Sequence, residues 1–411
     1  MQFTDKEKQE LINNSKTFCM MPWVSIHSSP RGIAIPCCIA HQSHNIGDVN
    51  QSSMMELVNS PGMNQLRRDM VDGVKNLMCG TCYSHEEHGI KSLRQTANEE
   101  FQKYFDESMV YTDRTGELGL FKMRYFDLRL NNICNMKCRT CNSSYSSQWE
   151  NEDAKQGIRI DTVRKDQRKK YMEDILQHIP YMDIAYFAGG EPMITEEHYI
   201  MLEEMIRLGR TDIQLRYNTN MSNLKYKNKD LLDLWSRFSQ KIDVSASIDD
   251  FGKRAEYIRS GTVWEEVEEN FRKLRSLPYV HTSINSVLSI FNFVTLNEFY
   301  NYLIDNNLYT PEDRVYTIYN MVGPPQYAAL ALPMHLKTFG LENLNQIISR
   351  MENMGFSELH LTQLINAKKW VMKDHTWGIY KDRFQKDTVR LDSLRSEKFS
   401  EVFPHLSELM K

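Results

Sequence analysis

From residue 121 onwards, strand patterns alternate with amphipathic helix patterns. Segments with the two-residue period of a β-strand lie at 124–130, 183–188, 213–217, 242–248, 281–290 and 314–319. Segments with helical spacing separate most of them, at 195–208, 229–238, 264–276 and 295–306. Strands separated by helices predict a parallel α/β sheet, and six strands are too few for the usual closed eight-stranded barrel. We therefore predict an open, partial (β/α)6 TIM-like barrel over residues 121–325.

The first 120 residues follow a different pattern, with short elements interrupted by cysteine, glycine and proline. Residues 24–26 and 32–37 have the pattern of a β-hairpin, and residues 54–61, 63–70 and 92–110 have helical patterns. These features predict a small cysteine-rich α+β domain over residues 1–120.

The last segment, residues 326–411, has mostly helical patterns with breaks near 354–355 and 375–378, and it contains no cysteine. We predict a helical C-terminal region. Two roles suit it equally well, namely a cap over the open side of the barrel or a surface for a partner.

The composition describes an ordinary globular protein of 411 residues, 41% hydrophobic and 25% charged. A formal net charge of -4 gives no general attraction to nucleic acid or to an anionic membrane surface. The polar N-terminus is not a signal peptide, and no apolar run approaches the roughly 18 residues of a membrane helix. We therefore predict a cytoplasmic protein with neither a membrane nor a nucleic acid as partner.

The chain has eight cysteines, and their grouping indicates a more specific class than the composition does. The cytosol keeps thiols reduced, so grouped cysteines there indicate metal sites and not disulfides. Cys134, Cys138 and Cys141, the cysteine triplet, stand within eight residues. Three thiolates on one loop can hold an iron–sulfur cluster and leave one iron open. A zinc site or a redox loop is the alternative.

A second group, the four-cysteine set, consists of Cys19, Cys37, Cys79 and Cys82. The Cys-X-X-Cys spacing of its last two members lets both sulfurs reach one metal from a tight turn. We predict a four-thiolate cluster, with a structural zinc site or reduced buried cysteines as alternatives. Cys38 is the predicted spare, although it could take the place of Cys37.

Polar or glycine-rich segments follow the predicted strands. In chain order they are the cysteine triplet, Gly189-Gly190-Glu191-Pro192, Asn218 with Asn220, and Ser247 with Asp249. The carboxyl ends of parallel barrel strands meet on one face, so we predict that these residues share one site. Taken alone, each has a structural explanation, such as a plain turn for the glycines.

In this order and spacing, the segments resemble those of the radical SAM superfamily over roughly residues 121–325. The resemblance implies that the cysteine triplet holds a 4Fe–4S cluster whose open iron binds S-adenosylmethionine (SAM). Reductive cleavage of SAM would then give a 5′-deoxyadenosyl radical that abstracts a hydrogen atom from the substrate. Cluster and SAM supply this chemistry, while the protein binds, orients and shields them.

The resemblance also implies roles for the other residues. Gly189, Gly190, Glu191 and Pro192 match the segment that meets the methionine amino group, and Asn218 or Asn220 matches a contact to the ribose or carboxylate. Ser247, Asp249 and Arg259 are similar to the serine and arginine pair of the family's peptide-modifying branch. In that branch the serine hydroxyl meets the ribose of SAM and the guanidinium pairs with its methionine carboxylate. Just before the last cysteine, where the family usually has an aromatic residue, this chain has Thr140. The resemblance therefore implies weaker stacking on the adenine of SAM. The catalytic base stays unknown.

Residues 1–120 resemble the twitch and SPASM auxiliary-cluster domains, through Cys19-Met-Met-Pro22-Trp23, Gly47-Asp48 and Cys79-Gly-Thr-Cys82. The resemblance implies a second 4Fe–4S cluster, closed by four thiolates and suited to accept an electron from a substrate radical. Such domains usually follow the barrel, whereas this one precedes it.

The expected function is hydrogen abstraction from a peptide or protein side chain, with the auxiliary cluster assisting oxidation. A small carbohydrate- or nucleotide-derived substrate is the runner-up, because the resemblance includes twitch enzymes of both sorts. No separate leader-peptide-binding domain is evident, which counts against a dedicated peptide maturase. A non-catalytic metal-binding scaffold is the alternative from another class. Flavodoxin or ferredoxin is the expected electron donor.

Overall fold

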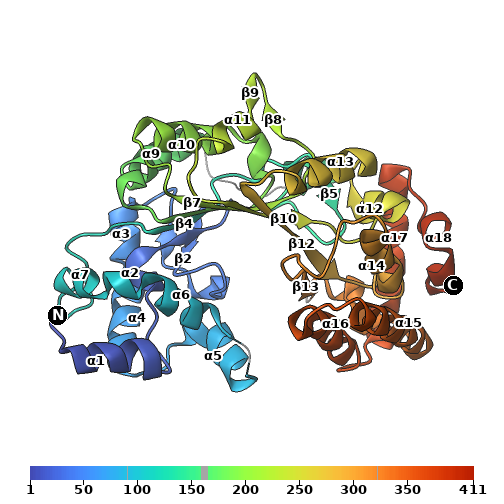
Figure 1. The fold of residues 1–411 in the computed structure, drawn as a ribbon, viewed down its shortest axis with the longest axis horizontal. Helices are drawn as coiled ribbons and strands as arrows, with labels where there is room; N and C mark the ends of the chain where they lie inside the picture. The colour runs from blue at the N-terminus through green and yellow to red at the C-terminus, as the bar shows by residue number, and fades with distance from the viewer. Residues whose placement is uncertain (90, 159–164, 322) are drawn as a thin grey trace. The chain divides into compact units, whose positions relative to one another are not determined.

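The computed structural model of the chain describes residues 1–89, 91–158, 165–321 and 323–411. Contacts divide the chain into two compact units. The first unit consists of Met1–Ile133, Ile158–Arg216 and Asp233–Gln240, and the second of Cys134–Gly157, Tyr217–Leu232 and Lys241–Lys411. Figure 1 labels most of the helices and strands of both.

In the first unit, the strands form a mixed sheet. In spatial order they are β6 (Ile184–Phe187), β4 (Tyr125–Leu128), β1 (His27–Ser28), β2 (Ile33–Ile35) and β3 (Gly47–Asp48). β6, β4 and β1 run parallel, whereas β2 is antiparallel to both β1 and β3. All four residues of β4 are buried, as in a strand covered on both faces. The N-terminal hairpin thus continues the sheet that begins with the parallel strands.

Short helices accompany these strands. They are α1 (Asp5–Gln9), α2 (Met21–Val24), α3 (Met54–Val58), α4 (Pro61–Val71), α5 (Gly80–Glu87), α6 (Leu93–Phe101), α7 (Phe105–Val110), α9 (Lys165–Leu176) and α10 (Glu196–Arg207). Ser53 and Ser92 begin α3 and α6 with capping boxes, in which the serine hydroxyl accepts a backbone N–H and the third helical residue reaches back. Local sequence therefore sets where these helices begin.

In the second unit, three parallel strands lie side by side. They are β10 (Ile242–Ser247), β12 (Val280–Leu288) and β13 (Thr317–Asn320). Two small antiparallel sheets pair β5 (Lys137–Cys138) with β11 (Arg259–Ser260), and β8 (Lys225–Tyr226) with β9 (Lys229–Asp230). β7 (Gln214–Thr219) belongs to both units, because the division falls after Arg216. Among the described residues, the main sheet has nine strands.

Burial alternates along β10 and β12, so each strand has one buried face and one partly accessible face. The register places Asp243 opposite His281, and Ser247 opposite Asn285, on the accessible face. Ser245 and Ser283, also opposite each other, share a hydrogen bond of 2.9 Å between their hydroxyls. This face is a polar strip that ends at Ser247.

The remaining helices of the second unit are α8 (Ser147–Ala154), α12 (Gly252–Ile258), α13 (Trp264–Arg275), α14 (Leu296–Asp305), α15 (Met334–Asn353), α16 (Glu358–Val371), α17 (Trp377–Arg395) and α18 (Phe399–Val402). α11 (Leu231–Trp235) lies at the division between the units. Gly355, with φ +84°, forms the turn after α15. Among the described residues, no helix combines the length and the apolar character that crossing a bilayer requires.

The predicted α/β class is confirmed, and all six predicted barrel strands are present with bounds shifted by a few residues. The hairpin is also confirmed, but its first strand was placed too early, because Val24 ends α2 and the strand begins at His27. The helix predicted for 229–238 is shorter, since Lys229 and Asp230 form β9. The C-terminal region is helical, with both of its breaks where the sequence predicts them.

Candidate functional site

The cysteine triplet lies on the loop after β4. Cys138 belongs to β5, where it pairs with Arg259 of β11. The backbone N–H of Cys141 donates to the carbonyl of Cys138 at 3.0 Å, which closes a tight turn between the two cysteines. The N–H of Met136 lies 3.5 Å from the sulfur of Cys134. The loop thus starts at Cys134, turns, and returns along a two-residue strand.

The N-terminal end of α8 supports this loop. The hydroxyl of Ser147 accepts from the N–H of Cys134 at 3.2 Å and donates to its carbonyl at 3.1 Å. Ser146 donates to the carbonyl of Met136 at 2.6 Å, and Trp149 donates from Nε1 to the carbonyl of Cys138 at 2.8 Å. Satisfied polar groups of this kind hold backbone in one conformation.

Arg259 lies beside the triplet and pairs with Asp249. Nε of Arg259 is 2.9 Å from Oδ2 of Asp249, and Nη2 is 3.1 Å from Oδ1. Nη1 lies 3.8 Å from the sulfur of Cys138. Burial alone would lower the pKa of Arg259, but Asp249 and Cys138 raise it above its usual value. A permanent cation therefore lies next to a triplet sulfur.

The triplet thiols are suited to a metal cluster. Burial raises the pKa of Cys138, against the effect of Arg259, and raises the pKa of Cys141 to about 12. Such thiols stay protonated without a cation, and metal binding deprotonates them. The three thiols and their half-buried position fit a 4Fe–4S cluster with one iron not bound by cysteine.

The two predicted asparagines differ in their contacts. Asn220 donates to Oδ1 of Asn135, within the triplet loop, at 2.9 Å. Asn218 lies inside β7, one residue before its end, and accepts from Asn285 at 2.9 Å. Asn220 is thus tied to the cysteine loop, while Asn218 joins the polar strip that ends at Ser247.

The Gly189–Pro192 segment lies in the first unit, directly after β6. The N–H of Glu191 donates to the carbonyl of Ile133 at 2.7 Å, and a Cβ on Gly190 would collide with that carbonyl. Glu191 is 1% exposed, and its carboxylate accepts the N–H of Met193 at 3.0 Å, which begins the short 3-10 turn at Pro192. Residue 190 must therefore be glycine, because the carbonyl of Ile133, the residue before Cys134, occupies the place of a Cβ.

The four-cysteine set comes together in the first unit. Cys19, Cys37, Cys79 and Cys82 line one small and mostly apolar cavity. Burial, together with the nearby thiols, raises the pKa of Cys37 to about 11 and that of Cys79 to about 12. Four thiols facing one apolar cavity fit a closed four-iron cluster.

Cys38 has different surroundings from Cys37. Burial raises the pKa of Cys38, and the carboxylate of Asp127 raises it further. Asp127 is 1% exposed and accepts from Arg129 at 2.8 Å, and His27 lies 3.3 Å from its second oxygen. The structure therefore groups Cys37 with the other three cysteines and Cys38 with a buried ion pair.

Within the parts of the chain that the structure describes, no three His, Cys, Asp or Glu side chains are arranged to hold a single metal ion. A four-iron cluster does not need such a set, because each thiolate binds a different iron.

Several supporting residues were not predicted from the sequence. Asn135, inside the triplet motif, bridges Asn220 and Ser222. Trp149 and Arg139 also hold the loop, and nothing in their spacing distinguishes them from ordinary core and surface residues. The one available indication was the position of Asn135 and Arg139 within the motif itself.

Comparison with protein families gives two matches. A model of the radical SAM superfamily matches residues 128–303, and a model described as an iron–sulfur cluster-binding domain (SPASM) matches residues 19–83. The first match contains the cysteine triplet, and the second contains the four-cysteine set. No curated protein matches the chain.

Several solved structures are similar to the chain at low identity. They include anSMEcpe with bound AdoMet and Cp18Cys peptide, at 15% identity and a TM-score of 0.36, covering 58% of this chain and 59% of that chain. SuiB of Streptococcus suis bound to precursor peptide SuiA has 12% identity and a TM-score of 0.36, covering 70% and 63%. The chain therefore spans less than two thirds of the length of both.

Proposed function

We propose that the chain is a radical SAM enzyme that cleaves SAM reductively and abstracts a hydrogen atom from a peptide or protein side chain. The matches of the radical SAM model to residues 128–303 and of the SPASM model to residues 19–83 support this proposal. The observation that carries this proposal is the pairing of Cys138 with Arg259, whose guanidinium lies 3.8 Å from the cysteine sulfur. A sulfur ligand and a carboxylate-binding group then lie side by side.

In this proposal Cys134, Cys138 and Cys141 hold a 4Fe–4S cluster. When bound, cluster and SAM supply a one-electron cleavage that yields a hydrogen-abstracting radical. Arg259 would meet the methionine carboxylate, since its planar fork matches a carboxylate, while Asp249 holds the guanidinium in place. Ser247 and Asn220 would contact the ribose, and Gly189 to Pro192 would meet the amino group.

The four-cysteine set would hold the auxiliary 4Fe–4S cluster. Four cysteine ligands leave no iron open, so this site is suited to transfer electrons and not to bind substrate. The apolar lining of its cavity, which includes Leu66 and Met70, would keep water from the cluster. Flavodoxin or ferredoxin would deliver the electron for SAM cleavage.

Anaerobic reconstitution with iron and sulfide tests the enzyme proposal. With SAM and dithionite, the wild-type protein should form 5′-deoxyadenosine, and Cys138→Ala should form none. A wild-type protein that retains iron but forms no 5′-deoxyadenosine would favour a non-catalytic metal-binding scaffold instead.

Iron counting tests the second cluster. A variant with Cys134, Cys138 and Cys141 all changed to Ala should retain the iron, sulfide and chromophore of one cluster. If the same variant contained zinc, or no metal, the four-cysteine set would be a structural zinc site or a group of reduced thiols.

A peptide substrate is supported by the likeness of Ser247 and Arg259 to the peptide-modifying branch. A true substrate should raise 5′-deoxyadenosine formation above the rate seen with SAM alone. Panels of peptides, sugars and nucleotides therefore separate the two substrate classes. Stimulation by sugars or nucleotides, and not by peptides, would favour the small-molecule alternative.

A further inference from the structure

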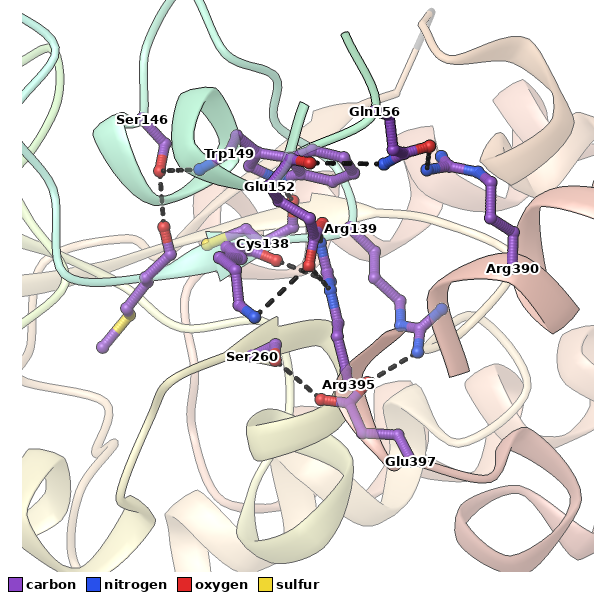
Figure 2. Close-up of polar contacts among 12 residues, drawn as sticks. Cys138, Arg139, Ser146, Trp149, Glu152, Gln156, Ser260, Arg390, Arg395 and Glu397 are labelled. Atoms are coloured by element: carbon purple, nitrogen blue, oxygen red, sulfur yellow. Dashed lines mark hydrogen bonds and ion pairs between the residues drawn. The ribbon is translucent and has the colours of Figure 1, made fainter. Parts of the chain in front are cut away.

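The end of α17 reaches the backbone of the cysteine triplet loop (Figure 2). Arg395 is the last residue of this helix, and its side chain is 1% exposed. Its Nη1 donates to the carbonyl of Lys137 at 2.8 Å, and its Nη2 lies 2.8 Å from Oε2 of Glu152. The guanidinium also lies over the ring of Trp149, 4.6 Å from its centroid. Arg395 thus links three groups around β5.

The two carbonyls of β5 therefore have separate donors from the surrounding helices. Arg395 of α17 binds the carbonyl of Lys137, and Trp149 of α8 binds the carbonyl of Cys138 at 2.8 Å. Glu152 contacts both Arg395 and Lys137, since its Oε1 also accepts from the ammonium of Lys137 at 3.3 Å. The strand that carries the central triplet cysteine is thus held by one C-terminal and one local side chain.

Arg139, the residue after Cys138, is held from the same segment. Its side chain is 0% exposed, and its Nη2 lies 2.6 Å from both Asp392 Oδ1 and Glu397 Oε2. The guanidinium lies 3.7 Å from the ring centroid of Tyr257, whose hydroxyl donates to Asp392 at 2.7 Å. A buried cation of this kind requires fixed anionic partners.

Glu397 also connects the segment to β11. Its Oε1 accepts from the hydroxyl of Ser260 at 2.6 Å, next to Arg259. Ser396, with φ 55° and ψ 38°, turns the chain after α17 so that Glu397 faces this strand. Residues 392–397 therefore contact both strands of the small sheet that holds Cys138 and Arg259.

We propose that Arg395, Arg139 and Glu397 are positioning residues for the SAM-binding cluster, and that residues 392–397 support the loop that carries its cysteines. This inference rests on the proposed function, because it requires a cluster at the triplet. Side chains that orient metal ligands change metal affinity or activity by about 10–100-fold when they are replaced. The C-terminal segment thus supports the cluster loop without contacting the cluster.

The test uses the full-length reconstituted protein and reads the two clusters separately. Electron paramagnetic resonance of the reduced protein, with and without SAM, identifies the triplet cluster as the one whose spectrum responds to SAM. Arg395→Gln and Arg139→Gln should lower the SAM-responsive signal about 10-fold, or shift its midpoint potential, and leave the other cluster unchanged. Arg395→Lys, which keeps the charge, should restore part of the loss.

Arg383→Gln is the matched control, because Arg383 lies on the same helix with its side chain 61% exposed. It should behave as wild type. Arg395→Gln and Arg139→Gln proteins with wild-type signal and potential would overturn the inference. Equal loss of both clusters in Arg395→Gln and Arg395→Lys would also overturn the inference, because it would indicate a general folding defect. A wild-type protein with no SAM-responsive cluster would overturn the proposed function itself.

Discussion

At the scale of single residues, the two adjacent cysteines of the N-terminal region are informative. Cys37 faces the cavity of the four-cysteine set, whereas Cys38 lies beside Asp127. The sequence does not decide which of the two is a ligand. Cys37 and Cys38 are adjacent, so their sequence distances to any other cysteine differ by one residue only. The side-chain environments distinguish them.

We expect Cys37→Ser to lose the auxiliary cluster and Cys38→Ser to keep it. The measurement is iron and sulfide per chain in a background with Cys134, Cys138 and Cys141 changed to Ala, so that only one cluster is counted. The opposite result, with iron lost only in Cys38→Ser, would assign the ligand to Cys38.

Arg259→Lys should reduce 5′-deoxyadenosine formation by about 10–100-fold. A lysine retains the charge but cannot contact both oxygens of Asp249 while also facing Cys138. Arg272→Lys is the control, because Arg272 is an arginine of α13, 42% exposed, that pairs with Glu268 one turn earlier in the same helix. Equal rates in both variants would remove Arg259 from the proposed site.

At the scale of elements, the close packing of Gly190 on Ile133 joins the turn after β6 to the start of the cysteine loop. The N–H of Glu191 completes the contact with a hydrogen bond of 2.7 Å to the Ile133 carbonyl. Any side chain at residue 190 would push this carbonyl away, and Cys134 is the next residue in the chain.

Gly190→Ala should therefore destabilise the protein by about 1–3 kcal/mol and reduce the iron bound at the triplet. Denaturant unfolding and iron counting measure the two effects. Gly378→Ala is the control, since nothing lies within 4 Å of a Cβ at that position. If both variants bound iron like wild type, the contact would have no role in shaping the loop.

The elements themselves were largely predictable, whereas several of their contacts were not. Alternation along β10 and β12 identifies strands because each has one buried face, and the cysteine spacing identifies the triplet loop. β5 and β11 have two residues each and no periodicity to detect. The contact of Arg395 with Lys137 joins residues far apart in sequence, and nothing local distinguishes Arg395 from other helical arginines.

At the scale of the whole molecule, each cysteine group is built within one unit. The four-cysteine set lies in the first unit and the cysteine triplet in the second. All four cysteines of the first group and all three of the second thus belong to a single unit each. Loss of one cluster should therefore leave the cysteines of the other group unchanged. The domain boundaries at residues 120 and 325 stay predictions.

Stability should fall on mild acidification through His178. Burial lowers the pKa of this imidazole to about 4, and its Nδ1 accepts the N–H of Met123 at 3.3 Å. An unfolded histidine, with a pKa near ~6.5, binds a proton that the folded one does not, so stability present at pH 7 is lost as pH falls from ~6.5 towards 4.

The comparison is between wild type and His178→Gln, which can still accept the Met123 N–H but does not titrate. Between pH 7 and pH 5, the free energy of unfolding should fall by about 1–2 kcal/mol more in wild type than in the variant. Parallel loss in both proteins would mean that His178 titrates normally in the folded state.

The distance in sequence between Arg395 and the cysteine triplet has a consequence for synthesis on the ribosome. The four-cysteine set, together with Arg94, which lines the same cavity, emerges early. The groups that bind the backbone carbonyl of Lys137 and the guanidinium of Arg139 emerge about 300 residues after Arg94, roughly 15–60 s later at ~5–20 residues per second. The nascent chain therefore contains all four cysteines of the first group early, whereas the cysteine triplet loop gains its C-terminal contacts only after translation has passed residue 397.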